Sequence, residues 1–102
     1  MTDPFARARF EPVVGSSFGV EGPHGPTALD LVRLEAGPGG PDYESYSLEF
    51  QGPVGLGQGI HHLQHPDLGP SELFLVPLDP RGGLGRYQAI VNRAITPDHQ
   101  EV

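Results

Sequence analysis

Apolar and polar residues alternate along several short segments of this chain, and glycine- or proline-rich stretches separate these segments. The clearest case is residues 45–51, where Tyr46, Leu48 and Phe50 fall on one side and the polar residues between them fall on the other. Alternation with a period of two is typical of an antiparallel strand that buries one face. Residues 45–51 are therefore predicted to form a half-buried β-strand.

Other segments have strand-like composition. Residues 10–14 and 17–21 flank Gly15-Ser16, which predicts two short strands around a tight turn. Residues 58–65 are predicted to form a strand that pairs with residues 45–51. Residues 73–78 are apolar throughout, which predicts a central strand covered on both faces and ending at Pro77. Residues 86–92 complete the set, with Tyr87, Ala89 and Val91 on one face.

The apolar pattern of residues 27–35 changes phase partway along the segment. Leu29 and Leu31 share one face of an extended strand, whereas Val32 and Leu34 share the other. A β-bulge near Leu31 and Val32 would restore a single inward face. One helical turn is the competing interpretation, because Ala28, Leu31 and Val32 also fit a period of 3.6.

Six or seven strands at intervals of about ten residues predict an all-β fold, a small antiparallel barrel or sandwich. The 102 residues are enough for one hydrophobic core. The 15 glycines and 12 prolines cluster between the apolar runs, as turn residues do. We predict one β domain over residues 9–95, with flexible tails at residues 1–8 and 96–102.

The charge of the chain narrows its range of partners. Thirteen acidic residues against six basic ones, all of them arginine, give a net charge of −7, which disfavours binding to a phosphate backbone. Cysteine is absent, which excludes disulfides and thiolate chemistry. The chain lacks a signal-peptide pattern and the run of about 18–20 apolar residues that a membrane helix needs. The default expectation is a cytoplasmic protein without a membrane association, which could still join an assembled particle.

The histidines at positions 61, 62 and 65 are the most conspicuous candidates for a metal site. On a strand His61 and His62 point to opposite faces, and His61 and His65 are separated by roughly 13 Å, so neither pair can chelate an ion. We expect His62 to be exposed and His65 to bond a nearby loop. The glycine-rich segments 55–59 and 81–85 lack the helix that a phosphate-binding loop requires and are predicted to be hairpin and Ω-type loops. The sequence therefore predicts no catalytic residue, metal or cofactor.

The ordered set of motifs resembles a little-characterised bacterial family of domains of unknown function, each of roughly 100 residues. The likeness spans about positions 10 to 92, and it is carried by residues 10–15 with Phe18, Leu29 with Leu31, residues 46–53, Leu56-x-Gln58-Gly59, His65 with Leu68-Gly69, residues 74–77, and Tyr87-x-Ala89-x-x-Asn92. The resemblance implies no assigned activity. It associates similar proteins with tail-collar-type fibre proteins of phage-like systems, which implies a structural role.

These observations favour a non-enzymatic structural or protein-interaction module, a part of a phage-tail-like or fibre assembly, that docks on a protein partner or self-associates. The alternative is a small-ligand-binding barrel. The residues expected to form an interaction or ligand surface are Tyr43, Tyr46, His62, His65 and Tyr87. A third possibility, a hydrolase that uses Ser47, requires a histidine within hydrogen-bond reach of that serine.

Overall fold

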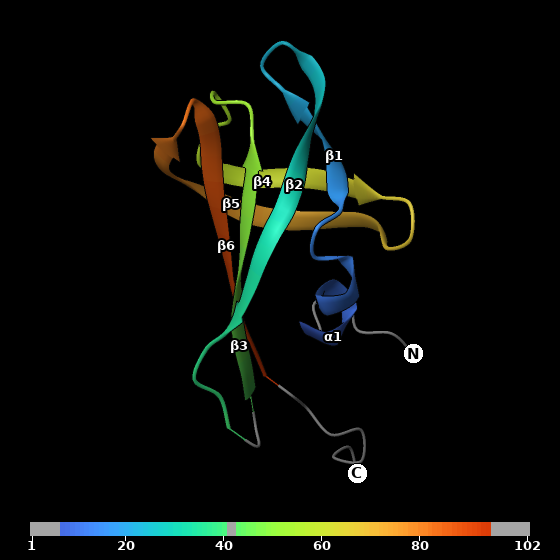
Figure 1. Ribbon diagram of the computed structural model, residues 1–102. Coiled ribbons are helices and arrows are strands. Elements are labelled where there is room, and N and C mark those ends of the chain that lie inside the picture. The colour runs from blue at the N-terminus through green and yellow to red at the C-terminus, as the bar shows by residue number, and fades with distance from the viewer. Residues whose placement is uncertain (1–6, 41–42, 95–102) are drawn as a thin grey trace.

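The computed structural model describes residues 7–40 and 43–94 (Figure 1). The described chain consists of a short helix, one turn of 3-10 helix and six strands. Their bounds are α1 Arg7–Phe10, η1 Glu11–Val13, β1 Ser17–Gly22, β2 Gly25–Ala36, β3 Tyr43–Gly52, β4 Gly59–His65, β5 Gly69–Arg81 and β6 Leu84–Ala94. The predicted all-β class is confirmed.

The six strands form one antiparallel sheet that closes on itself in the order β1-β2-β3-β6-β5-β4 (Figure 1). Hairpins join every pair of consecutive strands except β3 and β4, which are not neighbours in the ring. Residues 58–65 do form a strand, but the strand at 45–51 is not its partner. β4 pairs with β5 along its length and with β1 at two positions.

The interior of the ring is filled by side chains from alternate positions of the strands. A ring of six strands leaves little space once the interior side chains are in place. Phe18 and Phe50 meet edge to face with their ring centroids 5.6 Å apart. The predicted inward faces of residues 45–51 and 86–92 are confirmed. The largest fully buried side chains are Tyr46, Tyr87, Phe10, Phe18, Phe50, Leu29, Leu31, Leu48, Leu63 and Leu75.

A β-bulge interrupts β2 where the sequence predicted one. Leu31 pairs with Phe50 and Arg33 pairs with Glu49, so Val32 is the additional residue on the bulged strand. Leu29 and Leu31 are fully buried, and Val32 is 40% exposed. The bulge, rather than a helical turn, therefore accounts for the phase change of the apolar pattern.

Residues 10–14 do not form the predicted strand. Arg7–Phe10 is helical and Glu11–Val13 forms a 3-10 turn with Pro12 near its start, where a missing backbone N–H costs nothing. The ring of Phe10 lies 6.5 Å from that of Phe18 and 6.2 Å from that of Tyr46, between centroids, so α1 packs against the core below β1 (Figure 1). A strand would have required a neighbouring strand for its backbone. The helical turn directs Phe10 into the core, and the Glu44 carboxylate accepts the N–H of Arg7 at its start.

The predicted tails need one correction as well. Arg7 and Ala8 were assigned to the N-terminal tail and belong to α1. The remainder of residues 1–8 and all of residues 96–102 lie outside the described residues.

β5 differs from the prediction for residues 73–78 in two respects. Phe74 is 51% exposed, so one face of the segment is open rather than covered. Pro77 lies within the strand, opposite Tyr87, and β5 continues to Arg81. Gly82 and Gly83 then form the β5–β6 turn with φ values of 61° and 82°, the left-handed conformation that a two-residue hairpin requires. This confirms the turn interpretation of that glycine-rich segment.

Candidate functional site

The five residues expected to share a surface are not brought together. Tyr46, Tyr87 and His65 are buried, whereas Tyr43 and His62 are exposed. Tyr43 begins β3 and His62 lies on β4, strands that are not neighbours in the ring. The two buried tyrosines belong to the packed core, so they do not line a barrel mouth.

Tyr87 anchors the loop between β3 and β4. Its phenol donates a hydrogen bond to the Pro53 carbonyl at 2.7 Å and accepts one from the Leu56 N–H at 3.2 Å. A Cβ added at Gly85 would lie 2.7 Å from both the Pro53 oxygen and the Tyr87 hydroxyl. The close packing of the loop against β6 therefore requires glycine at position 85. Tyr87 therefore holds the β3–β4 loop in place at Pro53 and Leu56, and the Leu56 side chain is buried.

His65 bonds a nearby loop, as predicted, and its hydrogen bonds fix its role. Nδ1 accepts the Asp67 N–H at 3.0 Å, and Nε2 lies 2.9 Å from the Ser16 hydroxyl. Because Ser16 donates its proton to the Val13 carbonyl, Nε2–H is the donor in the contact with Ser16. A general base would present an unprotonated nitrogen to the serine. The pair therefore joins the connection between η1 and β1 to β4 structurally and does not activate Ser16.

The neighbouring histidines point in different directions. His61 Nε2 donates to the Gly57 carbonyl at 2.7 Å. His62 is exposed, as expected, and its Nδ1 lies 3.2 Å from Oε2 of Glu72. Among residues 7–40 and 43–94, no group of three histidine or carboxylate side chains is placed to share a metal ion. Ser47 lies on β3, between β2 and β6, and neither of these two strands contains a histidine. The neighbouring strands therefore offer Ser47 no histidine partner.

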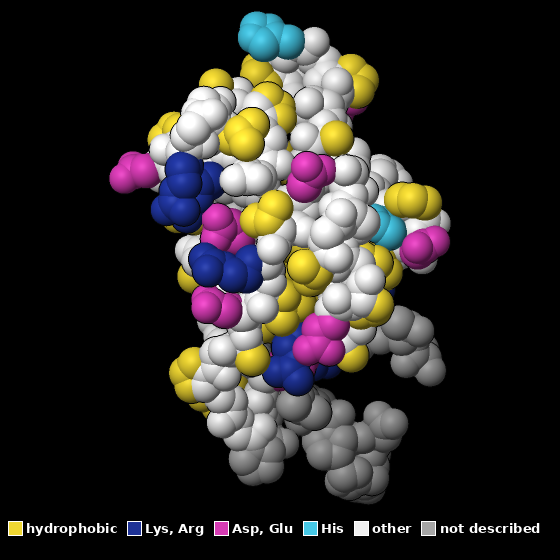
Figure 2. All heavy atoms as spheres, in the orientation of Figure 1, with side chains coloured by type: hydrophobic (Ala, Val, Ile, Leu, Met, Phe, Trp, Pro, Cys, Tyr) yellow, Lys and Arg dark blue, Asp and Glu magenta, His cyan; other side chains and the backbone are white. Residues whose placement is uncertain are grey.

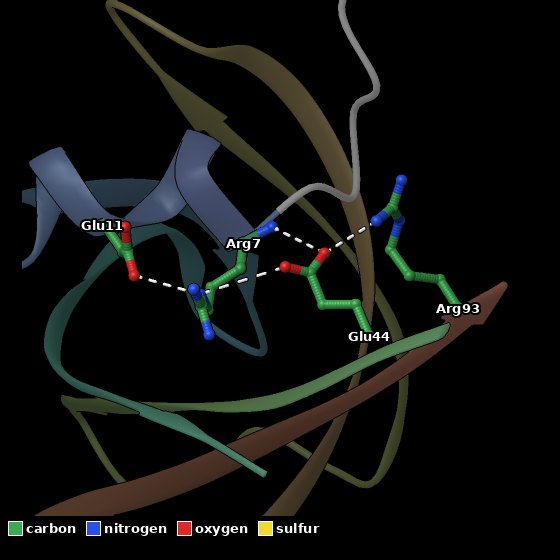
Figure 3. Close-up of polar contacts among 4 residues, drawn as sticks. All are labelled: Arg7, Glu11, Glu44 and Arg93. Carbon is green, nitrogen blue, oxygen red and sulfur yellow. Dashed lines mark hydrogen bonds and ion pairs between the residues drawn. The ribbon is translucent and has the colours of Figure 1, made fainter. Parts of the chain in front are cut away.

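A four-residue polar cluster fastens α1 to the lower ends of β3 and β6 (Figure 3). The Glu44 carboxylate accepts a hydrogen bond from the Arg93 guanidinium at 2.7 Å and another from the backbone N–H of Arg7 at 3.4 Å. The Arg7 side chain pairs with Glu11 at 3.0 Å and approaches Glu44 at 3.9 Å. These contacts hold α1 against the start of β3 and the end of β6.

A second ion-pair cluster lies on the outer face of β2, β3 and β6. Glu49 accepts hydrogen bonds from Arg33 at 2.7 Å and from Arg86 at 3.0 Å. Burial raises the pKa of Glu49, but the two arginines outweigh this effect and hold the pKa below its ordinary value. The carboxylate bridges the two guanidinium groups, so the cluster ties the three strands together and keeps a net charge of +1.

The outer face of β4 and β5 carries the most exposed apolar pair on adjacent strands. Ile60 and Phe74 are 64% and 51% exposed, and they are direct cross-strand partners. The adjacent pair on the same face is His62 opposite Glu72. We call these four residues the β4–β5 face. Directly opposed residues in an antiparallel pair have Cβ atoms about 4.5–5.5 Å apart, so Ile60 and Phe74 are neighbours in one apolar patch.

Sequence reasoning missed this patch. The apolar run at residues 73–78 predicts a strand covered on both faces, which would leave Phe74 buried. The available signal was the alternation of residues 58–65, which places Ile60 on the face of His62 and Gln64. Its pairing with Phe74, however, depends on the β4–β5 register.

The arginines lie away from this face. They occur in α1, β2, the last residue of β5, and β6, and β1, β4 and residues 69–80 contain none. In Figure 2 the dark blue side chains gather on the left and in the lower centre of the molecule. The exposed charges of β1 and the first part of β5 are the carboxylates Glu21 and Glu72. Arg9 donates to the Leu68 carbonyl in the β4–β5 turn. Away from that turn, the side of the ring formed by β1, β4 and β5 is acidic and partly apolar.

Residues 5–91 match the family described as a domain of unknown function (DUF6916), and the chain belongs to this family. The match covers most of the chain and includes every strand except the end of β6. No curated protein and no solved structure matches the chain. Within the described residues, neither helical segment has the length or apolar character needed to cross a bilayer.

Proposed function

We propose that this domain is a non-enzymatic protein-interaction module that docks a partner protein on its β4–β5 face. The observation that carries the proposal is the cross-strand pairing of the exposed residues Ile60 and Phe74. Exposed apolar side chains that touch one another are typical of interaction sites, whereas single exposed ones are ordinary. The aromatic side chain of Phe74 is of the kind that anchors protein interfaces.

The packed interior supports docking over the alternative of a ligand held inside the ring. Phe10, Phe18 and Phe50 meet in the core, and Tyr46 and Tyr87 are buried with them. A drug-sized ligand needs a cavity of about 300 Å³ or more. The described grooves of that size are lined by residues on the outside of the ring, most of them exposed or half-buried.

The charge of the domain favours a different protein over a second copy. A net charge of −7 on each chain opposes self-association, and the acidic side that includes Glu72 attracts a cationic surface. The partner we propose has an apolar centre bordered by basic side chains. From the family resemblance alone, we extend the proposal to a structural part of a phage-tail-like or fibre assembly.

Affinity capture from the source organism tests the proposal, with Ile60→Thr/Phe74→Thr as the interface variant. Ile90→Thr is the matched control, because Ile90 is 63% exposed but lies on β6, outside the β4–β5 face. The wild type and Ile90→Thr should capture the same partner, and the double variant should lose it. Equal capture by all three would refute the proposal, as would a wild type whose solution mass is that of a stable homodimer.

A further inference from the structure

The ring of strands is closed by a very short ladder between β1 and β4. These strands share two register pairs, Gly19 with Gln64 and Val20 with Leu63. On its other side β4 pairs with β5 at all seven of its residues. The first four residues of β4, residues 59–62, therefore have a strand partner on one side only.

A surface groove of about 320 Å³ begins over the paired residues Gly19 and Gln64 and extends to His62, the first residue of β4 beyond the ladder. Glu21, Pro26 and Thr27 form one wall, on the β1–β2 hairpin, and His62 and Gln64 form the other. Val20 contributes to the lining between the walls. We call this the β1–β4 groove. It adjoins the β4–β5 face, because His62 belongs to both.

We infer that the β1–β4 groove binds an extended basic peptide segment, which adds as a strand alongside residues 59–62 of β4. Alternate residues of a strand direct their N–H and C=O groups to the same side, so an unpaired edge presents a ready template for another strand. Recognition by strand addition takes its affinity from these main-chain bonds and its specificity from alternate side chains.

The shape of the molecule favours a single peptide strand over the sheet edge of a second copy. The β1–β2 hairpin projects beyond the rest of the ring (Figure 1) and forms one wall of the groove. The β3–β4 loop lies against this hairpin near Gly22 and Pro23. An extended segment would therefore enter along the groove beside His62. The edge of a second folded domain would have to pass the hairpin first.

Charge complementarity defines the peptide. Glu21 is exposed on the hairpin wall, and Glu72 lies opposite His62 beside the groove. No arginine lies on β1, β4 or residues 69–80. Since side chains of an added strand alternate between its two faces, a peptide of alternating basic and apolar residues can place its charges near these carboxylates.

The inference rests on the proposed function and specifies the partner segment. The test uses the full chain and a fluorescein-labelled decapeptide of alternating valine and lysine, measured by fluorescence anisotropy. A decapeptide with methyl groups on alternate backbone nitrogens is the matched control, because it keeps the charge and side chains but loses backbone donors. Methylation should weaken binding at least about tenfold, the equivalent of one or two lost hydrogen bonds.

Two further measurements locate the site. Glu21→Gln should weaken binding about two- to fivefold, the range expected for one exposed charge pair, and Glu35→Gln on β2 should leave binding unchanged. Hydrogen exchange should slow at the amides of residues 59–62 when the unmethylated peptide binds.

Several results would overturn the inference: no binding of the valine–lysine peptide, equal binding of the methylated peptide, equal binding of a valine–glutamate peptide, or unchanged exchange at residues 59–62. A homodimer in which these amides are already protected would place a second copy in the groove and would also overturn it. If the peptide fails while Ile60→Thr/Phe74→Thr still loses the captured partner, strand addition is wrong and the β4–β5 docking face stands.

Discussion

Replacing Phe10 with alanine tests whether α1 is part of the core. Phe10 is fully buried, with its ring 6.5 Å from Phe18 and 6.2 Å from Tyr46 between centroids. Truncating a buried phenylalanine typically costs about 3–5 kcal/mol. A domain of this size has a free energy of unfolding of about 5–15 kcal/mol, so Phe10→Ala should remove a large part of its stability.

Urea denaturation followed by far-UV circular dichroism measures this loss. Val14→Ala is the control, because Val14 lies just after η1 and is 40% exposed, and it should change stability by less than about 0.5 kcal/mol. Phe10→Leu keeps an apolar side chain at the site and should cost less than Phe10→Ala. If Phe10→Ala lies within about 1 kcal/mol of the wild type, the helix does not contribute to the core as we describe.

Three further substitutions test the polar contacts and close packing of the ring. The pKa of Glu49 is lowered below its ordinary value of 4.5, so its stabilisation is complete above that pH and is lost as the pH falls through the folded-state pKa. The stability difference between wild type and Glu49→Gln should therefore shrink between about pH 6 and about pH 3 in urea titrations, and a constant difference would contradict this assignment. Tyr87→Phe should cost about 1–3 kcal/mol in the same assay, because the buried Leu56 N–H loses its acceptor, whereas the exposed Tyr43→Phe should be neutral. Gly85→Ala should lower the thermal midpoint, since overpacking costs about 1–3 kcal/mol, and an unchanged midpoint would show that the neighbouring loop can move away.

The local pattern of side chains was sufficient to predict several elements. Alternation places Tyr46, Leu48 and Phe50 in the core and predicts the bulge beside Leu31, because side-chain direction along a strand depends only on position in the chain. The turn at Gly82 and Gly83 is equally local, since its backbone conformation favours glycine. The exposure of His62 and the bonding of His65 to a loop followed from the same alternation.

Tertiary contacts decided the remaining features. Phe10 is equally compatible with a short strand or a helix by composition, and the space beside Phe18 and Tyr46 selects the helix. Phe74 belongs to an apolar run that would suit a doubly covered strand, but in this ring nothing described covers its outer face. Burial depends on which elements pack against a strand, and a run of apolar residues does not specify them.

The candidate docking surface is therefore a property of the fold. Ile60 and Phe74 are fourteen positions apart in the chain and are neighbours only because β4 and β5 pair in this register. The groove beside them begins over the short ladder between β1 and β4 and extends beyond it to His62. The sequence by itself predicted the six strands of the ring, the inward faces of residues 45–51 and 86–92, and the acidic charge. Only the tertiary structure decided which exposed residues meet, because strand order and register bring together positions that are distant in sequence.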